Sequence, residues 1–474
     1  MSELVWMTAV ELATLIKRGA VSSTEVLRAH LDQIDAVNSE LNAIVTYLPE
    51  MALELARQAD EKQARGEELG ILHGLPIAHK DANETKGIRT TMGSPVYSDY
   101  VPESDDLIIA RLKDAGCITL GKTNVPEFGA GSHTFNRVFG ATRNPYDLSR
   151  TCGGSSGGAA VALATGMIPI ADGSDLGGSL RNPASFCNVV GFRPAPGRVP
   201  KYPAANAWAR LGVDGPMGRT VQDVALMLQA IAGYDPRAPI SLQVPASIFA
   251  DHLGHDFAGV KIAYSPDLGE LPVDPQVTGT IEKQLPVFSD LGCHLERAAP
   301  DFRDAYEIFQ TLRAWSFELS FAERFAEFGE EQFKDTIRWN VAQGKDLTAA
   351  QISRVEVKRT ELFHRVREFL DTYEFLLLPT AQVPPFLLEW EYPTQINGVA
   401  METYIDWMMS CAFITVTELP AISVPCGFTD DGLPVGLQIV GRPRSEFSVL
   451  QLAFAFQEAT RFYQQKPPIC QNQM

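Results

Sequence analysis

Two segments of this sequence combine serine hydroxyls with closely spaced glycines. The first, residues 153–158, reads GGSSGG and leads into the small-residue stretch AAVALA. The second, residues 172–179, reads DGSDLGGS and follows the apolar run Met167–Ala171, which we predict to be a strand. Glycine permits positive φ and a close approach of the backbone to another group, so both segments predict tight loops. A serine held beside a proton acceptor in such a loop is equipped for nucleophilic catalysis.

A lysine is the candidate proton acceptor. Lys80 ends a segment that we predict to be a buried strand, because it follows the apolar residues Leu75, Ile77 and Ala78. Burial disfavours the ammonium ion and lowers the pKa of a lysine, which is the condition under which lysine acts as a base. The alternative is a structural ion pair between Lys80 and Asp81.

Other chemistries of serine and glycine loops fit less well. A phosphate-binding P-loop needs a lysine directly after the glycines, where this chain has Ala159. The S-x-x-K arrangement of β-lactamases is absent from the sequence. Residues 153–157 do match the G-x-S-x-G nucleophile elbow, which requires a downstream acid and histidine. The histidines that follow are not in the loop context expected of such a base, but the sequence leaves this alternative open; they are His252, His255, His294 and His364.

Taken together, these residues resemble the amidase signature family, whose members use a Ser, cis-Ser, Lys triad. The resemblance rests on Lys80, on residues 153–158 and on residues 175–181, which read DLGGSLR. It extends to three further segments, which are 122–128 (KTNVPEF), 214–217 (DGPM) and 432–438 (GLPVGLQ). It therefore covers most of the chain.

The resemblance implies a role for each member of this set. Ser179 would be the nucleophile, Ser155 the bridging serine and Lys80 the base. The peptide bond between Gly154 and Ser155 would be cis. The oxyanion hole would be formed by the backbone N–H groups of Leu176, Gly177, Gly178 and Ser179. The acyl pocket would be lined by Gly129, Ala130 and Gly131. The triad needs no cofactor and no metal ion.

Several neighbouring polar residues are predicted to be structural. Ser156 and Asp175 would hold the two loops by hydrogen bonds, and Arg181 would pair with Asp175 or another acid. His79 and His133 would be satisfied structural histidines, because the triad leaves them no necessary chemistry. Cys152, beside the first loop, would serve in packing.

The elements that must position these residues predict an α/β fold. We expect one large domain, residues 1–474, with a central mixed, twisted β-sheet covered by α-helices, as the resemblance implies. Residues 1–70 would be helical, with capping boxes at Thr8–Glu11 and Ser22–Glu25. Residues 71–215 would form the catalytic core, with a strand at 117–121, and residues 300–410 a variable, mostly helical region that shapes the substrate site. Near the end, strands 421–425 and 435–440 would flank a turn, and Ser445 would cap a final helix through Phe456.

Composition narrows the function classes. The 474 residues carry a formal net charge of −18 and no basic run, which disfavours nucleic acid and anionic membranes as partners. The seven cysteines are an odd number without C-x-x-C spacing, so we expect reduced thiols in a cytoplasmic protein. The first residues lack the pattern of a signal peptide, and no window has the roughly 20 apolar residues that span a bilayer.

The expected substrate is a small-molecule amide. Residues 300–410 contain many aromatic side chains, so an aromatic pocket for an aryl or hydrophobic acyl amide is the favoured interpretation, and helix core is the alternative. A stand-alone hydrolase of broad amide specificity, similar to acylamidases, is preferred. The alternatives are the glutaminase subunit of a tRNA amidotransferase and hydrolases specific for indoleacetamide, cyclic amide oligomers or carbamates. Family members are often dimers, so the resemblance is compatible with a homodimer.

Overall fold

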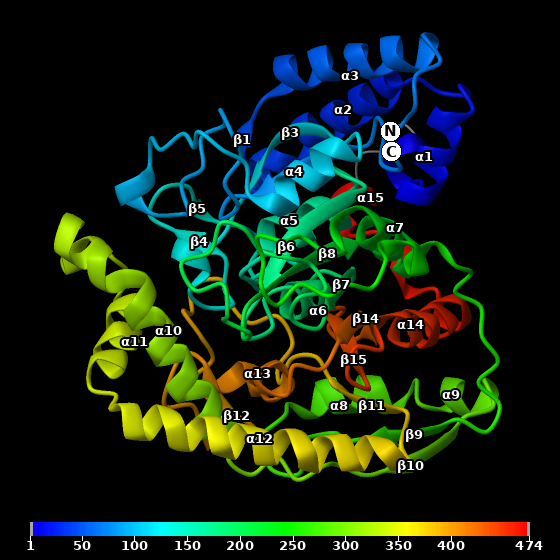
Figure 1. Cartoon of the computed structure of the whole chain (residues 1–474). Coiled ribbons are helices and arrows are strands. Elements are labelled where there is room, and N and C mark those ends of the chain that lie inside the picture. Colours follow the sequence, from blue (N-terminus) through cyan, green and yellow to red (C-terminus); the bar gives the residue numbers. More distant parts are fainter. Residues whose placement is uncertain (1–2, 472–474) are drawn as a thin grey trace.

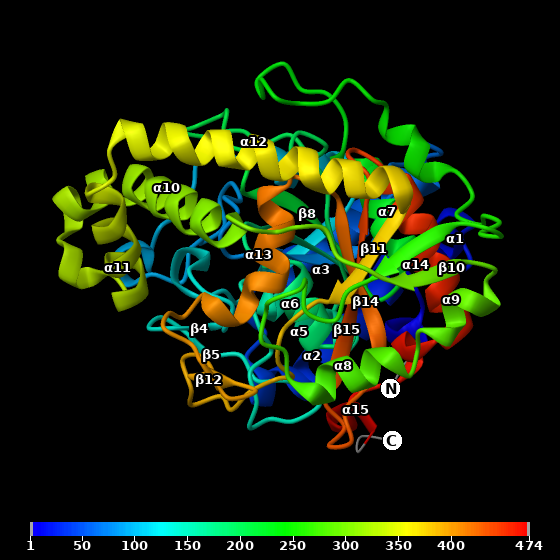
Figure 2. The same ribbon diagram turned by 90° about the horizontal axis from the view of Figure 1, so that it is seen from below.

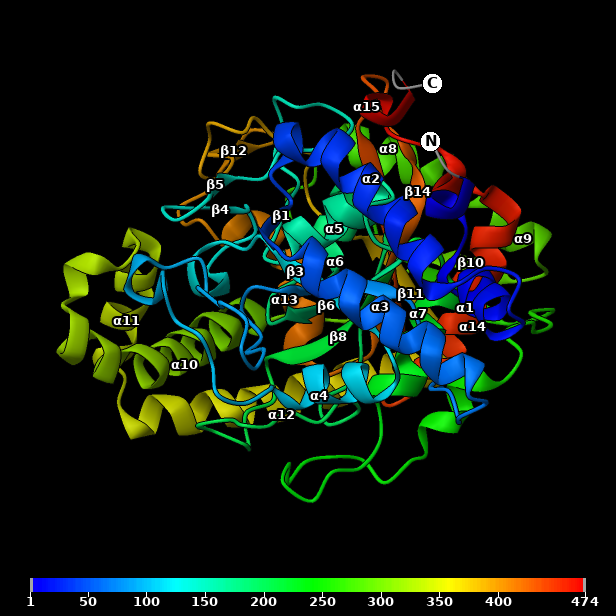
Figure 3. The same cartoon turned by 90° about the horizontal axis from the view of Figure 1, so that it is seen from above.

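Three helices at the start of the chain form one end of the molecule, at the top of Figure 1. The computed structural model describes residues 3–471. Helices α1 (Ala9–Lys17) and α2 (Ser23–Leu41) begin at Thr8 and Ser22, and both capping boxes predicted from the sequence are present. Helix α3 (Pro49–Ala64) follows. Figure 3 shows α2 and α3 lying across this end of the molecule.

A small sheet beneath these helices carries the lysine strand. Its order is β1 (Ile44–Tyr47), β3 (Ile118–Thr123) and β2 (Pro76–Lys80), and helix α4 (Leu107–Asp114) precedes β3. β2 and β3 are parallel, whereas β1 and β3 are antiparallel. All five residues of β2 are buried, which confirms the prediction of a buried strand ending at Lys80.

The central sheet has eight strands. Across the sheet they are β10 (His294–Arg297), β9 (Lys261–Tyr264), β11 (Phe375–Pro379), β15 (Pro434–Gly441), β14 (Ala421–Phe428), β7 (Val190–Arg193), β8 (Val213–Gly218) and β6 (Ile170–Asp175). β9 is parallel to β10 and β11, and the remaining neighbours are antiparallel. The sheet is therefore mixed, as predicted. Two short hairpins, β4 (Phe135–Asn136) with β5 (Gly140–Ala141) and β12 (Gln395–Ile396) with β13 (Val399–Ala400), lie outside it.

Helices cover both faces of this sheet. Along β11, Phe375 and Leu377 belong to one apolar cluster, and Leu376 and Leu378 belong to the other. The first cluster includes α1, α4, α7 (Val221–Ile231), α8 (Pro275–Glu282), α9 (Pro286–Asp290) and α14 (Glu446–Thr460). The second includes α2, α3, α5 (Gly157–Ala164), α6 (Arg181–Phe186), α10 (Ala305–Phe328), α12 (Ala349–Thr372) and α13 (Met409–Val416). The chain is a single α/β domain built around a mixed sheet.

In the region of residues 300–410, which was predicted to be mostly helical, α10, α11 (Asp335–Lys345) and α12 lie between residues 305 and 372, and the strands β11, β12 and β13 follow them. In Figures 1 and 2, α11 and the end of α10 lie at one edge of the molecule, and α12 runs past the strands of the large sheet. Among residues 3–471, no helix combines the length and the apolar character needed to cross a bilayer.

Three predicted elements differ in detail. The strand expected at Met167–Ala171 is β6, which begins at Ile170 and continues to Asp175, so half of the second predicted loop is strand. Ser445 does precede α14, but its hydroxyl donates to the Arg442 carbonyl and does not cap the helix. α14 is not the last helix, because α15 (Pro468–Gln471) follows it.

Candidate active site

The backbone of Lys80 is fixed by an aspartate on the edge strand of the large sheet. The carboxylate of Asp172, on β6, accepts hydrogen bonds from the Lys80 N–H at 3.1 Å and from Asn83 Nδ2 at 2.7 Å. It is also paired with His79 Nδ1 at 2.7 Å. These contacts join β2 to β6 and therefore hold the end of the lysine strand against the large sheet.

The Lys80 amine is surrounded by three serine hydroxyls. Its Nζ lies 2.8 Å from Ser155 Oγ, 2.9 Å from Ser156 Oγ and 2.9 Å from Ser174 Oγ. A neutral amine has two N–H donors and one lone pair. Two of the hydroxyls can accept from it while the third donates to it, and the three hydroxyls can equally accept from the three N–H groups of an ammonium ion, so the arrangement accommodates both forms of the lysine.

Burial accounts for the acidity of this lysine. The Lys80 side chain is fully buried, and desolvation lowers its pKa to about 7. The carboxylates of Asp214 and Asp172 oppose this effect and stabilise the ammonium form. The amine can therefore accept a proton near neutral pH. The alternative predicted from the sequence is wrong, because Asp81 accepts hydrogen bonds from Thr91 and forms no ion pair with Lys80.

Residues 153–156 form a buried turn directly before α5, and Gly157 and Gly158 are the first residues of the helix. The Gly154–Ser155 peptide bond is cis, which confirms the prediction. Helix α5 has no exposed residue, as expected for its small side chains. A Cβ at Gly158 would lie 2.4 Å from the backbone nitrogen of Asn124, so only glycine permits this close approach. Figure 1 shows α5 and β6 near the centre of the molecule.

The carbonyls on either side of this turn are also held. Ser132 Oγ donates to the Gly154 carbonyl at 2.5 Å, and Thr134 Oγ1 donates to the Gly153 carbonyl at 2.8 Å. Asn182 Nδ2, from α6, donates to Ser132 Oγ at 3.1 Å. The turn that carries Ser155 is therefore fixed from two sides.

Ser179 lies in the loop that leaves β6, and backbone contacts place it next to the first turn. The Ser156 N–H donates to the Ser179 carbonyl at 3.2 Å. The Ser179 residue is partly exposed, whereas Ser155 and Lys80 are buried. Among residues 3–471 the Ser179 hydroxyl has no hydrogen-bond partner. The structure thus joins Lys80 to Ser155 directly and leaves the Ser179 hydroxyl unengaged.

Asp175, the last residue of β6, organises the loop of residues 176–179. Its carboxylate accepts from the N–H groups of Gly178 at 2.9 Å and Leu180 at 3.2 Å. It also pairs with Arg181 at 2.9 Å, which confirms the predicted pair, and with Arg193 at 3.2 Å. The loop-holding role predicted for Asp175 is therefore observed.

One of the four predicted oxyanion-hole donors is already occupied. The N–H of Gly178 is used by Asp175, so it cannot also be directed at a substrate oxygen. Among the described residues, the N–H groups of Leu176, Gly177 and Ser179 have no protein acceptor. The predicted set is thereby reduced to these three groups.

Residues 129–131 lie against the first turn. A Cβ at Gly129 would be 3.2 Å from Ser155 Oγ, and one at Gly131 would be 3.6 Å from the ring of Tyr404. Ala130 differs, because its methyl group packs into a separate cluster with Phe317, Phe321 and other phenylalanines. The methyl group of Ala130 therefore lies in this apolar cluster, and the lining of the acyl pocket by Gly129, Ala130 and Gly131 stays a prediction.

The predicted structural histidines and Cys152 have internal partners. His79 lies between Asp172 and Thr119, and His133 Nδ1 lies 2.6 Å from Thr151 Oγ1. Burial lowers the pKa of His133 to about 3 and raises that of the Cys152 thiol to about 12. Neither the His133 imidazole nor the Cys152 thiol is therefore suited to proton transfer near neutral pH.

Sequence reasoning missed the roles of Asp172, Ser174 and Ser132. Asp172 and Ser174 stand two residues apart on β6, and both side chains reach β2. Polar residues at alternate positions of a buried strand mark one face that meets polar partners, and this was the available signal. Ser132 lies in a loop, where the sequence gives no comparable signal.

The aromatic residues of the 300–410 region divide into different groups. Phe309 lies beside the second loop, because a Cβ at Gly177 would be 2.9 Å from Phe309 Cζ. Tyr404 lies beside Gly131. Trp315 and Tyr306 are exposed, and Phe317 and Phe321 pack with each other. Only part of the predicted aromatic set therefore lies near the two loops.

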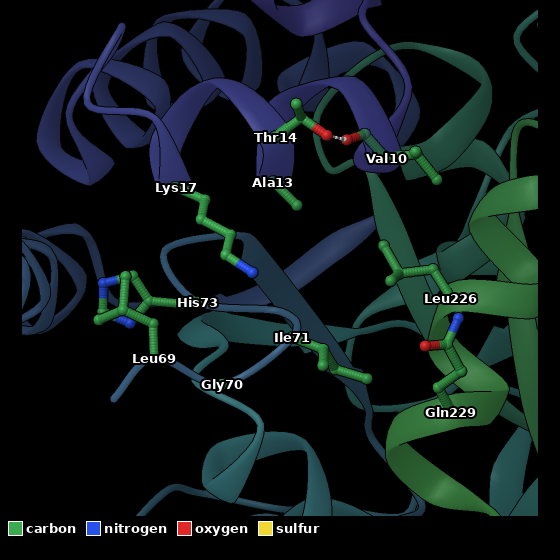
Figure 4. A pocket seen from close by; sticks show the side chains of 10 residues that line it. All are labelled: Val10, Ala13, Thr14, Lys17, Leu69, Gly70, Ile71, His73, Leu226 and Gln229. Carbon is green, nitrogen blue, oxygen red and sulfur yellow. Dashed lines mark hydrogen bonds between the residues drawn. The ribbon is translucent and has the colours of Figure 1, made fainter. Parts of the chain in front are cut away.

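A separate hollow of about 220 Å³ lies between α1, residues 69–73 and α7 (Figure 4). Lys17, Ile71 and Leu226 line it, and Figure 4 shows Lys17 pointing into it. None of the predicted catalytic residues contributes to this hollow. Among residues 3–471, no group of three or more His, Cys, Asp or Glu side chains is placed to hold a metal ion.

Comparisons with known proteins agree on the family. The family model described as Amidase matches residues 25–450. A glutamyl-tRNA(Gln) amidotransferase subunit from Moorella thermoacetica is 36% identical, over 98% of this chain and 99% of the relative. An acylamidase of Rhodococcus erythropolis is 34% identical, over 98% of each chain.

Among solved structures, a bacterial aryl acylamidase of the amidase signature family superimposes with a TM-score of 0.91. It is 31% identical, and the match covers 98% of both chains. The match to the family model and the similarity along nearly the whole chain lead to one conclusion. This chain belongs to the amidase family of hydrolases, which act on amide C–N bonds.

Proposed function

We propose that this chain is a broad-specificity amidase, active on aryl and other acyl amides, that works through an acyl-enzyme on Ser179. The observation that carries the proposal is the buried Lys80 amine, with a pKa of about 7, at 2.8 Å from Ser155 Oγ. This geometry supports a proton path in which Ser155 connects the lysine to Ser179.

In the acylation step, Ser179 Oγ forms a bond to the carbonyl carbon of the amide. The Ser179 proton passes to Ser155 Oγ, and the Ser155 proton passes to the neutral Lys80 amine. When the C–N bond breaks, the proton returns along the same path to the leaving amine. A water molecule then attacks the acyl-enzyme through the same relay and releases the carboxylic acid and free Ser179.

The oxyanion formed in each step needs fixed donors. The N–H groups of Leu176, Gly177 and Ser179 are the candidates. Asp175 holds their loop in place, because its carboxylate accepts hydrogen bonds from the N–H groups of Gly178 and Leu180. A preorganised loop does not have to reorient as charge develops. Loss of one such donor typically costs about 3 to 4 kcal/mol in the transition state.

The acyl group would lie beside Gly129 and Gly131. Phe309 and Tyr404 would form its apolar walls, since both rings approach glycines of these loops. An aromatic wall favours aryl or hydrophobic acyl groups. The similarity to the Rhodococcus acylamidase and the fold of the aryl acylamidase support this substrate class.

The second candidate is the glutaminase subunit of a tRNA amidotransferase, which the similarity to the Moorella protein favours. The chain departs from that subunit at residues 336–340, TIRWN, where the expected tyrosine-rich segment and glutamine-binding arginine are not recognisable. The Arg338 guanidinium in this segment pairs with Asp335.

One experiment separates these candidates. The purified chain is incubated with glutamine, benzamide, acetanilide, indoleacetamide, an aryl carbamate and a linear amide oligomer, and products are measured by mass spectrometry beside Ser179→Ala. We expect cleavage of the acyl and aryl amides that requires Ser179, and an intact-mass adduct equal to the acyl group. Ammonia release from glutamine alone would favour the amidotransferase subunit, and hydrolysis that persists in Ser179→Ala would refute the proposed nucleophile.

A further inference from the structure

In the described part of the chain, one buried arginine has neither the carboxylate partner nor the backbone carbonyl acceptors that the other buried arginines have. Five arginines among residues 3–471 have buried side chains. Arg181 and Arg193 pair with Asp175, and Arg198 pairs with Glu446. Arg219 donates to backbone carbonyls, including that of Ile168 at 3.1 Å. Arg313, on α10, has no carboxylate of the described residues within the 4 Å of an ion pair.

The environment of Arg313 leaves most of its donors unused. The side chain is only 4% exposed, and Nε is buried without an acceptor among the described residues. Nη2 donates to the Tyr404 hydroxyl at 2.7 Å, and the guanidinium carbon lies 4.4 Å from the ring centre of Phe317. A buried charge is unfavourable unless a counterion and hydrogen bonds compensate for its desolvation. The ring faces and one phenol oxygen leave this charge without a counterion.

The Tyr404 hydroxyl is a further donor. Its oxygen accepts from Arg313 Nη2 and also from Asn340 Nδ2 at 2.5 Å. With two donors directed at this oxygen, its own hydrogen must point elsewhere, and no acceptor for it is found among residues 3–471. The cluster of Arg313, Tyr404 and Asn340 is therefore rich in donors and lacks an acceptor.

This cluster borders the loops of the proposed active site. Phe309 is one helical turn before Arg313 on α10, so their side chains lie on the same face, and the Phe309 ring meets the loop at Gly177. The Tyr404 ring meets Gly131. Both contacts place the cluster beyond the segment that would line the acyl pocket.

We infer that Arg313 and Tyr404 bind a carboxylate at the far end of the substrate's acyl group. The preferred substrates are then monoamides of dicarboxylic acids, which keep one free carboxylate. A planar guanidinium with unused N–H groups matches the two oxygens of a carboxylate, and the carboxylate supplies the missing charge. This inference rests on the proposed function, because it takes the acyl group to lie beside residues 129–131.

The test compares matched anilides. Monoanilides of succinic, glutaric, adipic and pimelic acid are paired with anilides of the same chain length that end in a methyl group, and kcat and KM are measured for each. We expect a higher kcat/KM for the carboxylate at one chain length, by about 10- to 100-fold, the range of hydrogen bonds to a charged group. This higher kcat/KM is expected to come mainly from a lower KM for the carboxylate substrate.

Arg313→Gln should abolish the advantage in kcat/KM of the carboxylate substrate over the methyl-ended substrate. Arg313→Lys should restore part of this advantage. Tyr404→Phe keeps the ring and should lower the ratio severalfold, so the inference remains testable if Arg313→Gln does not fold. Arg303→Gln is the matched control, because the Arg303 side chain, two residues before α10, is 70% exposed. The ratio of kcat/KM between the two substrates should equal that of the wild type.

Three results would overturn the inference. In the first, the wild type shows no preference for the carboxylate at any length. In the second, Arg313→Gln lowers activity on both members of each pair equally. In the third, methyl-ended anilides that carry a carboxylate on the aniline ring are added to the panel, and only these depend on Arg313. The proposed function fails separately, when neither member of any pair is hydrolysed in a manner that requires Ser179.

Discussion

Asp175 accepts the backbone N–H of Gly178, three residues later, at 2.9 Å, and this contact closes the loop before Ser179. The same carboxylate pairs with the buried guanidinium groups of Arg181 and Arg193. The loop geometry therefore depends on a charged group that is itself held inside the protein.

Asp175→Asn tests this dependence. The amide would leave two buried guanidinium groups without their counterion, and breaking a buried pair costs about 3 to 5 kcal/mol. We expect the free energy of unfolding, measured by urea denaturation, to fall by that amount, and kcat to decrease. Asp371→Asn, which removes an exposed pair with Arg367, should change the free energy of unfolding by less than about 1 kcal/mol. Equal midpoints for Asp175→Asn and the wild type would contradict the assignment.

The pH dependence of turnover should follow the Lys80 amine. Because the base must be neutral and burial lowers its pKa to about 7, kcat/KM should fall tenfold per pH unit below that value. Asp214 stabilises the ammonium form, so Asp214→Asn should lower the pKa and shift the acid limb to lower pH. A pH profile that Asp214→Asn does not move would argue against Lys80 as the titrating group.

The same amine should affect stability. The unfolded chain holds the Lys80 proton up to about pH 10.5, whereas the folded chain loses it near pH 7. In that interval the unfolded state binds more protons, so the free energy of unfolding rises with pH by up to about 1.4 kcal/mol per unit. Lys80→Met lacks this contribution. Urea unfolding between pH 7 and 9.5 should show a smaller rise for Lys80→Met than for the wild type.

The control for this measurement is Lys283→Met, whose side chain is 66% exposed in the wild type. Its unfolding free energy should keep the wild-type pH dependence. Parallel curves for the wild type and Lys80→Met would show that the amine is charged in the folded protein at neutral pH.

The cysteines should be unreactive in the folded state. All seven are unpaired and buried, and burial raises the thiol pKa, to about 12 for Cys152 and Cys411. Iodoacetamide at pH 8 should leave native protein unmodified and active, whereas protein in urea should be alkylated at seven positions. Rapid alkylation of native protein with loss of activity would contradict the packing role predicted for Cys152.

The sequence predicts the parts of the site that depend on local pattern. The strand ending at Lys80, the glycine-rich turn at Ser155 and the capping boxes each follow from neighbouring residues, and the structure confirms them. The contacts across the sheets do not follow from local pattern. The hydrogen bond from the Lys80 N–H to Asp172 could not be predicted, because it depends on the pairing of segments 92 residues apart. The contact between Asp175 and the Gly178 N–H is local, and the loop-holding role of Asp175 was predicted.

Composition was a weaker guide to the substrate region. The aromatic residues of 300–410 predicted a pocket, but Phe317 and Phe321 stack in a core cluster and Trp315 faces solvent. Helical periodicity does not show which helix face meets another element. The counterion missing at Arg313 became visible only when the packing of α10 was known.

The lysine and one of its three serine partners lie on two different sheets. Lys80 is on the three-stranded sheet, Ser174 is on the eight-stranded sheet, and 94 residues separate them. The amine therefore has all three hydroxyl partners only after the two sheets have docked. Recovery of activity during refolding should then report the last long-range docking event, and it should follow the early signals of helix formation in circular dichroism.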